Sequence, residues 1–346
     1  MSVPERPKPL KSSLLVPESY LGKTSKRAAQ TDNSAIDDRE YWWSHTPAPS
    51  PESPAFERVD DQLILNRLRA QIDRRELPII EIPANVMRTL KILDDPDFTY
   101  NDVIGLIEHS PAMAGEFIKI INSSFYGSGI TVRDLKAALP RLGKTKLKSL
   151  LFIYSSRMNF LGSKQFNNIA VDIVEHSYAV GLIASYLSQR LFADPDIAFL
   201  AGLLHDIGKL AIIKGVSETH AIPADLGFAL SETTFQHIFP ELHEKAGLLV
   251  AENWKLEDDV KIAILHHHDL KLTGIKSRDP ELTLHLCQLI NLSDTMARML
   301  GKGRALGSPV NLFDLPSAIG LGLEKDWNTV EFLNDIPAVV NFKLDR

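Results

Sequence analysis

The chain has 346 residues, 44% of them hydrophobic, which is enough for two ordinary domains or for one larger body with a tail. Its formal net charge of −6 gives no reason to expect DNA or an anionic membrane as a partner. The single cysteine, Cys287, excludes an internal disulfide and suits a reducing compartment. The early Lys and Arg residues are not followed by the apolar segment of a secretory signal, and no uncharged apolar run is long enough to span a bilayer. We therefore expect a cytoplasmic protein.

The first 56 residues predict a disordered N-terminal tail. They are rich in Pro, Ser, Lys and Asp and show no sustained periodicity. Tyr41-Trp42-Trp43 is unusual in this tail, because aromatic side chains in a disordered segment can dock on a folded surface of the same chain or of a partner. The alternative is that these aromatic residues pack against the first helix of the folded domain.

From Val59 onward the spacing of apolar residues is that of amphipathic helices, with intervals of three and four. Asp94-Asp95-Pro96 and Ser110-Pro111 end two of these helices. No segment alternates as a strand would, and no repeat recurs at a fixed period. We predict an all-α fold, with a first helical part over residues 57–160, a helical bundle over 161–304 and a helical extension over 305–346.

The stretch from Phe199 to Leu210 places His205 and Asp206 at the end of an apolar run. Its periodicity predicts a core helix that ends near Gly208. Burying a charged pair there costs on the order of several kcal/mol unless something compensates the charge. A metal ion would provide that compensation.

Five core-facing segments carry histidine or aspartate among apolar residues. A single histidine in such a position is most often a hydrogen-bonded core residue, but five segments together favour a metal site. Imidazole and carboxylate suit zinc, iron or manganese, and one aspartate can bridge two ions that activate water toward phosphate esters. The alternative is that every histidine is structural and no metal binds. The segments contain His176, His205-Asp206, His243, His266-His267-His268 and Asp294.

The order of His176, His205-Asp206 and Asp294 resembles the H…HD…D pattern of the HD superfamily of metal-dependent phosphohydrolases. His243 and the His267-His268 pair resemble the larger ligand set of the HD-GYP branch, whose members hydrolyse cyclic di-GMP at a two- or three-metal centre. The resemblance implies one ion held by His176, His205, Asp206 and Asp294. It also implies a second ion, held by His243, His267 and His268 and bridged by Asp206.

The same resemblance implies that Lys209 contacts phosphate and makes Asp172, one turn before His176, an additional candidate ligand. Adjacent helical residues lie about 100° apart, so His266, His267 and His268 cannot all face one centre. His267 and His268 best fit the family's spacing. After this pair the chain reads Asp269-Leu-Lys-Leu-Thr-Gly-Ile-Lys, without the Gly-Tyr-Pro signature of the HD-GYP branch.

Over a longer stretch, from about Leu77 to about Asp269, the chain resembles the HDOD domain. The resemblance rests on Leu77-Pro78, on Ser110-Pro111, on the turn from Asn122 to Gly127 and on Ala137 to Gly143. HDOD proteins are α-helical modules of bacterial signalling and are usually regulatory. The resemblance therefore implies an HD-domain-like bundle with an N-terminal HDOD helical subdomain.

Two functions follow from these resemblances. The first is a bacterial signalling protein that binds one or two metal ions and acts through protein or nucleotide binding, with other signalling proteins such as response regulators or diguanylate cyclases as partners. The second is an active metal-dependent phosphohydrolase for a nucleotide, a cyclic dinucleotide or another phosphate ester, with Asp206 and Lys209 as its catalytic residues. We expect regulation, because the surrounding chain resembles a regulatory domain more than an enzyme.

Overall fold

Every regular element that the structure describes is helical. The computed structural model describes residues 41–44, 59–110, 113–115, 117–118, 134–159, 166–191, 194–218, 232–270, 277–304, 306 and 310–340. No strand occurs within these ranges, so the predicted all-α class is confirmed. All helices below belong to the unit Asp37–Arg346.

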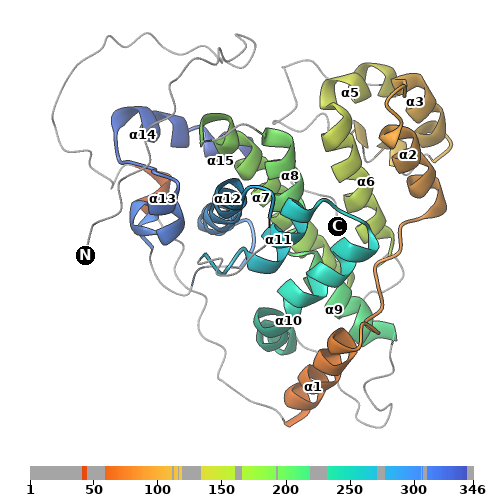
Figure 1. The fold of residues 1–346 in the computed structure, drawn as a ribbon, viewed down its shortest axis with the longest axis horizontal. Coiled ribbons are helices and arrows are strands. Elements are labelled where there is room, and N and C mark those ends of the chain that lie inside the picture. The colour runs from red at the N-terminus through yellow and green to blue at the C-terminus, as the bar shows by residue number, and fades with distance from the viewer. Residues whose placement is uncertain are drawn as a thin grey trace. The chain divides into compact units, whose positions relative to one another are not determined.

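Helices α2, α3, α5 and α6 gather at the upper right of Figure 1. Helix α3 packs against α2 and α5, and α6 packs against the same two helices. A capping box starts α3, because the Thr99 hydroxyl accepts the Asp102 N–H while the Asp102 carboxylate accepts the Thr99 N–H. The bounds are α2, Ala84–Asp94; α3, Tyr100–Glu108; α5, Leu135–Leu142; and α6, Lys144–Met158.

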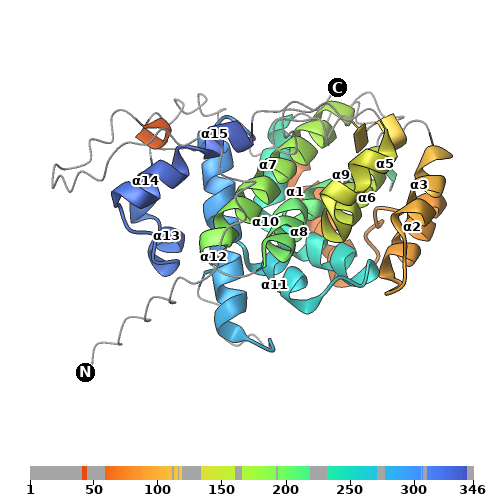
Figure 2. The ribbon, with the colours of Figure 1, turned by 90° about the horizontal axis from the view of Figure 1, so that it is seen from above.

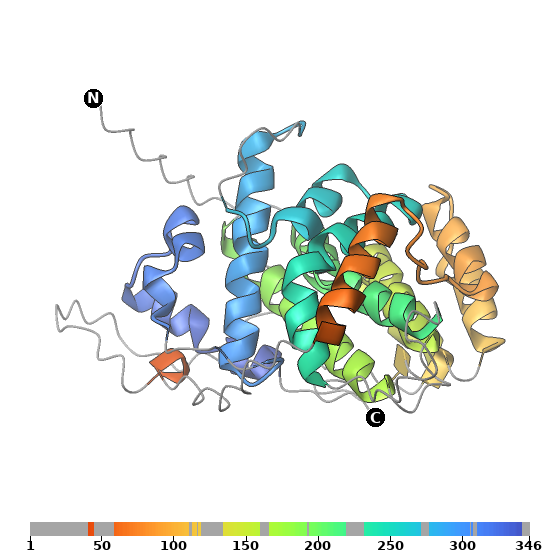
Figure 3. The same cartoon turned by 90° about the horizontal axis from the view of Figure 1, so that it is seen from below.

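The candidate ligands lie on the next group of helices. Helix α7 packs against α8 and α12, α10 packs against α9 and α11, and α11 also contacts α12. Helix α1, Val59–Asp73, lies beside α10 in Figure 3 and contacts it and α9. The bounds are α7, Asn167–Leu191; α8, Pro195–Leu204; α9, Ile207–Glu218; α10, Glu232–Asn253; α11, Asp258–His266; and α12, Pro280–Met299.

The predicted core helix at Phe199–Leu210 is divided at His205-Asp206. Helix α8 begins after Asp194, whose carboxylate accepts two backbone N–H groups of the first turn, and it ends at Leu204. The prediction that Gly208 marks a helix end is wrong, since Gly208 lies in the first turn of α9. A Cβ at Gly208 would come within 1.8 Å of the His243 carbonyl oxygen, so glycine is required for α9 to approach α10 this closely.

A hydrogen-bonded node at Asn159 joins the helices on either side of residue 160. The Asn159 amide accepts the backbone N–H of Glu81 at 3.1 Å and donates to the Glu81 carbonyl at 2.9 Å. Its oxygen also accepts from the buried ammonium of Lys214 on α9, at 2.9 Å. Beside this node Trp254 stacks on Phe152 of α6, with ring centroids 4.9 Å apart. These contacts hold the N-terminal helices against α9 and α10.

The Tyr41-Trp42-Trp43 segment docks on the chain's own C-terminal extension. Trp43 is buried and meets Phe313 edge to face, with ring centroids 6.1 Å apart, and the Trp42 indole donates to the Leu333 carbonyl at 2.9 Å. Of the alternatives considered above, a folded surface of the same chain is the one observed. The extension is drawn at the left of Figure 2 and comprises η5, Leu312–Asp314; α13, Pro316–Gly320; α14, Trp327–Leu333; and α15, Ile336–Val339.

Two sequence predictions fall outside the described residues: most of the tail over residues 1–56, and the turn from Asn122 to Gly127. Among the helices that are described, none has both the length and the apolar character needed to cross a bilayer.

Candidate metal centre

The ligand atoms of the predicted residues form three groups, in each of which the atoms lie within 4.8 Å of one another. All of these residues are buried except His268, which is exposed. The groups are His176 with His205 and Asp294; His205 with Asp206 and His267; and His243 with His267 and His268. Helices α7, α10 and α12, the turn between α8 and α9, and the end of α11 therefore bring their side chains to one place.

Asp206 lies in the middle of these groups. Its Oδ2 is 3.3 Å from His205 Nε2 and 3.6 Å from His176 Nε2, and its Oδ1 is 3.7 Å from His243 Nε2. Oδ1 is buried, and no described residue donates a hydrogen bond to it. Burial would raise the pKa of Asp206, but the charges of His205 and Lys209 outweigh it and hold the pKa well below its usual range. The Asp206 carboxylate is therefore ionised, with Oδ2 near His176 and His205 and Oδ1 near His243.

Four of the imidazole rings are oriented by the same kind of hydrogen bond. In each of them Nδ1 donates to a backbone carbonyl, so Nε2 faces the centre as the atom that can bind a metal. Metal-ligating histidines typically have such a partner on their other nitrogen. The pairs are His176 with Lys302 at 2.9 Å, His205 with Gly202 at 2.7 Å, His243 with Phe239 at 2.6 Å and His267 with Ile264 at 2.9 Å.

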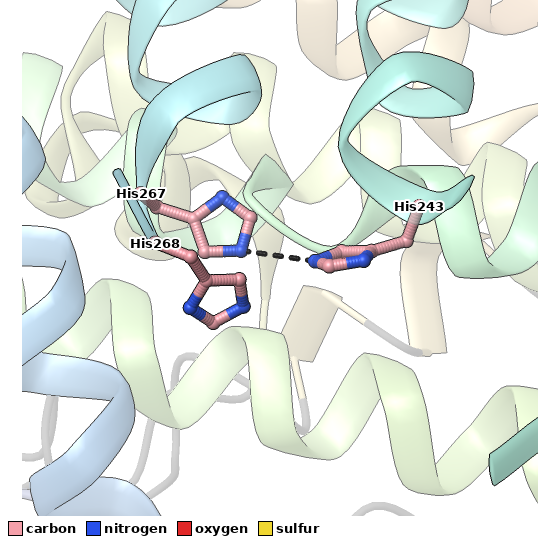
Figure 4. A group of neighbouring side chains, drawn as sticks. All are labelled: His243, His267 and His268. Atoms are coloured by element: carbon pink, nitrogen blue, oxygen red, sulfur yellow. Dashed lines mark hydrogen bonds between the residues drawn. The ribbon is translucent and has the colours of Figure 1, made fainter. Parts of the chain in front are cut away.

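The Nε2 atoms of His243 and His267 face each other at 3.2 Å, the contact dashed in Figure 4. Burial lowers the pKa of His243 to about 4, and burial together with the neighbouring imidazoles lowers that of His267 well below its usual range. Both rings are therefore neutral at pH 7. Because each carries its proton on Nδ1, two lone pairs meet and the contact has no donor. Two nitrogen ligands at about 2.1 Å from one ion would lie roughly this far apart, so these residues fit a metal ion.

Asp294 lies between His176 and Arg298. Its Oδ1 is 3.1 Å from His176 Nε2, and its Oδ2 is 3.7 Å from Arg298 Nη1. Burial would raise the pKa of Asp294, but the hydrogen bond and charge of His176 outweigh it and hold the pKa well below its usual range. A cation bound between Asp294 Oδ1 and His176 Nε2 would be held by both atoms.

The remaining predicted residues differ in their placement. Lys209, in the first turn of α9, contacts the Asp206 carboxylate through its ammonium group. Asp172 lies on α7 one turn before His176, but it is exposed and belongs to none of the three groups. His266 is outside them too, and its Nδ1 lies 3.9 Å from Asp269 Oδ2.

Sequence reasoning missed several groups that touch the ligands. The carbonyl of Lys302 and the backbone of Gly303 lie against the His176 ring. Glu244 accepts the backbone N–H of His268, and burial raises the pKa of Glu244. Glu244 could have been suspected because it follows His243 in the sequence, whereas a backbone carbonyl has no sequence signature.

The family model of the HDOD domain matches residues 79–270, which is more than half of the chain. The chain belongs to the HDOD family. The resemblance inferred from the sequence is thereby confirmed. Among curated proteins, the HDOD chain is 25% identical over 226 residues to an uncharacterised protein of Treponema pallidum (strain Nichols), a match that covers 61% of this chain and 42% of that protein. The chain thus spans less than half the length of this relative.

Several solved structures share the fold. A candidate metal-dependent phosphohydrolase of Shewanella amazonensis superposes with a TM-score of 0.62 at 19% identity, over 82% of this chain and 99% of that one. An HDOD domain protein of Geobacter sulfurreducens gives 0.56 at 21%, over 82% and 98%. A candidate signal transduction protein of Marinobacter aquaeolei gives 0.54 at 17%, over 82% and 66%. At these identities the likeness shows the fold alone.

Proposed function

We propose that this chain is a cytoplasmic bacterial signalling protein that binds one or two divalent metal ions and acts through protein or nucleotide binding. The observation that carries the metal claim is the 3.2 Å approach of His243 Nε2 to His267 Nε2, two neutral nitrogens without a proton between them. Iron, manganese and zinc all suit the imidazole and carboxylate set. The single, buried Cys287 is compatible with the reducing cytoplasm.

The proposal assigns two ligand sets that share Asp206. The shared role is supported by the two Asp206 oxygens, which approach different histidines, and by the missing hydrogen-bond partner of Oδ1 among the described residues. His268 is exposed, so the second set opens toward solvent and toward any ligand that arrives there. The sets are His176, His205, Asp206 and Asp294 for one ion, and Asp206, His243, His267 and His268 for the other.

Two observations favour regulation over catalysis. The chain belongs to the HDOD family, and its fold is shared by the Marinobacter aquaeolei chain named for signal transduction. The sequence after His268 lacks the Gly-Tyr-Pro signature that accompanies cyclic di-GMP hydrolysis in the branch it resembles. The partners we propose are other signalling proteins, such as response regulators or diguanylate cyclases, and a nucleotide or cyclic dinucleotide as a small-molecule ligand.

The second candidate function is a metal-dependent phosphohydrolase. It is favoured by the grouped ligand atoms, by the ammonium of Lys209 beside Asp206, and by the name of the Shewanella amazonensis protein with the same fold. Bound ions would supply Lewis-acid chemistry toward a phosphate ester. Lys209 would hold a phosphate oxygen, and Asp206 would keep the site anionic enough to retain both ions.

Metal binding is tested on protein purified without a histidine tag, by elemental analysis and by calorimetric titration with Mn²⁺. We expect one or two ions per chain, with affinity at least about tenfold weaker in Asp206→Asn, because a ligand of both sets is neutralised. Asp196→Asn is the matched control, since Asp196 is an exposed aspartate at the other end of α8. No metal in the wild-type protein, and none taken up, contradicts the proposal.

A second experiment separates the two functions. The Mn²⁺- or Fe²⁺-loaded protein is given cyclic di-GMP, nucleoside monophosphates and a generic phosphodiester, and both binding and product formation are measured. A regulator is expected to show no turnover with any of them. Turnover that disappears in Asp206→Asn and persists in Asp196→Asn would establish the phosphohydrolase instead.

A further inference from the structure

We propose that the turn after α12, residues 301–304, orients the His176 ring, and that Lys302 and Gly303 are positioning residues of the metal centre. The inference rests on the proposed function in one respect, since it takes His176 as a metal ligand.

The first step is that both nitrogens of His176 are held by α12 and the turn that follows it. The Lys302 carbonyl accepts Nδ1–H at 2.9 Å, while Nε2 lies 3.1 Å from Asp294 Oδ1. Asp294 is on α12, and Lys302 comes three residues after that helix ends. Helix α12 therefore supplies one candidate ligand, and the turn after it sets the direction of another.

The second step is that Gly303 leaves room for the ring. A Cβ at this position would lie 2.5 Å from His176 Nδ1 and 3.0 Å from Cγ, well inside van der Waals contact. Its φ of +108° is also one that L side chains rarely adopt. Any larger residue must push the ring away from the Lys302 carbonyl.

The third step is that the turn itself is anchored. The Lys302 ammonium pairs with Glu175 Oε1 at 2.9 Å, and Glu175 directly precedes His176 on α7. On the other side the Arg298 Nε–H donates to the Arg304 carbonyl at 2.9 Å. Both ends of the turn are thus tied to the helices that carry His176 and Asp294. A ring fixed in this way binds a metal without first losing rotational freedom.

The test compares Gly303→Ala with Gly301→Ala. Gly301 belongs to the same turn and also has a positive φ, +73°, but a Cβ there would meet nothing within 4 Å. Gly301→Ala therefore adds positive-φ strain in the same turn, smaller than at Gly303, without touching the ring. Two quantities are measured: the affinity for Mn²⁺ by calorimetry, and the solvent exchange of the His176 Nδ1–H proton by NMR in metal-free protein.

We expect Gly303→Ala to weaken Mn²⁺ binding about tenfold to a hundredfold and to abolish the protected Nδ1–H signal, because the ring leaves its carbonyl acceptor. Gly301→Ala should keep the signal and stay within about threefold of the wild-type affinity. Wild-type affinity together with an unchanged Nδ1–H signal in Gly303→Ala would overturn the inference.

Glu175→Gln provides a second measurement should Gly303→Ala fail to fold. It removes the ion pair of Lys302 and leaves the glycine in place, so we expect about twofold to fivefold weaker Mn²⁺ binding and faster Nδ1–H exchange. If the exchange rate of the His176 Nδ1–H proton is unchanged, the turn does not position the ring. If the wild-type protein binds no metal, the proposed function fails, but the Nδ1–H signal still decides whether Gly303 orients His176.

Discussion

Gly208 of α9 lies directly against the backbone carbonyl of His243 on α10, with space for a hydrogen atom but not for a methyl group. Because Asp206 lies two residues before Gly208, this contact sets how close the aspartate and the histidine can come. Their side chains approach to 3.7 Å. The packing of two helices thus determines the spacing of two candidate ligands.

Gly208→Ala is expected to destabilise the protein by about 3 kcal/mol or more, because a Cβ would meet backbone atoms that cannot rotate away. Gly105→Ala, in α3, is the matched control: nothing lies within 4 Å of its Cβ, so the higher helix propensity of alanine should stabilise by about 0.5–1 kcal/mol. Urea unfolding followed by circular dichroism measures both. Equal stability of the two variants would show that α9 can move away from α10.

His267→Asn tests the facing imidazoles. The asparagine amide can still donate to the Ile264 carbonyl, as Nδ1 does, but Nε2 is gone. We expect the free energy of unfolding of the metal-free protein to fall by about 1–2 kcal/mol, because the smaller side chain leaves a gap among the neighbouring imidazoles while the hydrogen bond is kept. The rise in Tm on adding Mn²⁺ should fall markedly relative to wild type. If Mn²⁺ raises the Tm of His267→Asn as much as that of the wild type, the metal does not bind His267.

Trp43→Ala should loosen the C-terminal extension without affecting the metal centre. Trp43 is 3% exposed and packs on Phe313, so its removal should cost about 3 kcal/mol of local stability. Hydrogen exchange in η5 and α14 should become faster, while the Mn²⁺-dependent rise in Tm stays the same. Trp327→Ala is the control, because this tryptophan is 51% exposed. Similar exchange in both variants would mean that Trp43 does not secure the extension.

Stability above pH 9 should depend on Cys287. Burial raises the pKa of this thiol to about 12, whereas in the unfolded chain it ionises near pH 9. Between these values the unfolded state has released the proton and the folded state has kept it, so the free energy of unfolding falls by about 1.4 kcal/mol per pH unit. Chemical unfolding from pH 8 to 11 should show a shallower slope in Cys287→Ala. The native thiol should also resist a thiol reagent at pH 8 until the protein unfolds.

Much of the candidate site could be predicted from the sequence, because each grouped residue is polar at a position where helical periodicity requires an apolar one. His176 and Asp294 could be placed in this way on long helices. The division of the core helix at His205-Asp206 could not, since His205 keeps helical dihedrals and the apolar spacing continues through the break. The close approach of α9 to α10 at Gly208, just after this break, is a tertiary contact that helical periodicity does not reveal.

Contacts between residues far apart in the sequence could not be predicted either. The His176 ring bonds to a carbonyl 126 residues away, and every residue type offers that same carbonyl. Likewise Trp42 and Trp43 were recognisable as anchors, but their acceptor at Leu333 and their neighbour Phe313 follow only from how the extension packs.

The node at Asn159 has a thermodynamic consequence. One amide bonds both backbone groups of Glu81 and the buried ammonium of Lys214, which also pairs with Glu218 Oε1 at 3.5 Å. Losing the position of this amide would leave the ammonium with fewer partners in the interior. The helices before and after residue 160 should therefore unfold as one cooperative unit, with a single calorimetric transition whose enthalpy matches the van't Hoff value. We therefore expect a perturbation of the N-terminal helices to change the free energy of unfolding of the whole body, α9 included, instead of moving α9 about a hinge.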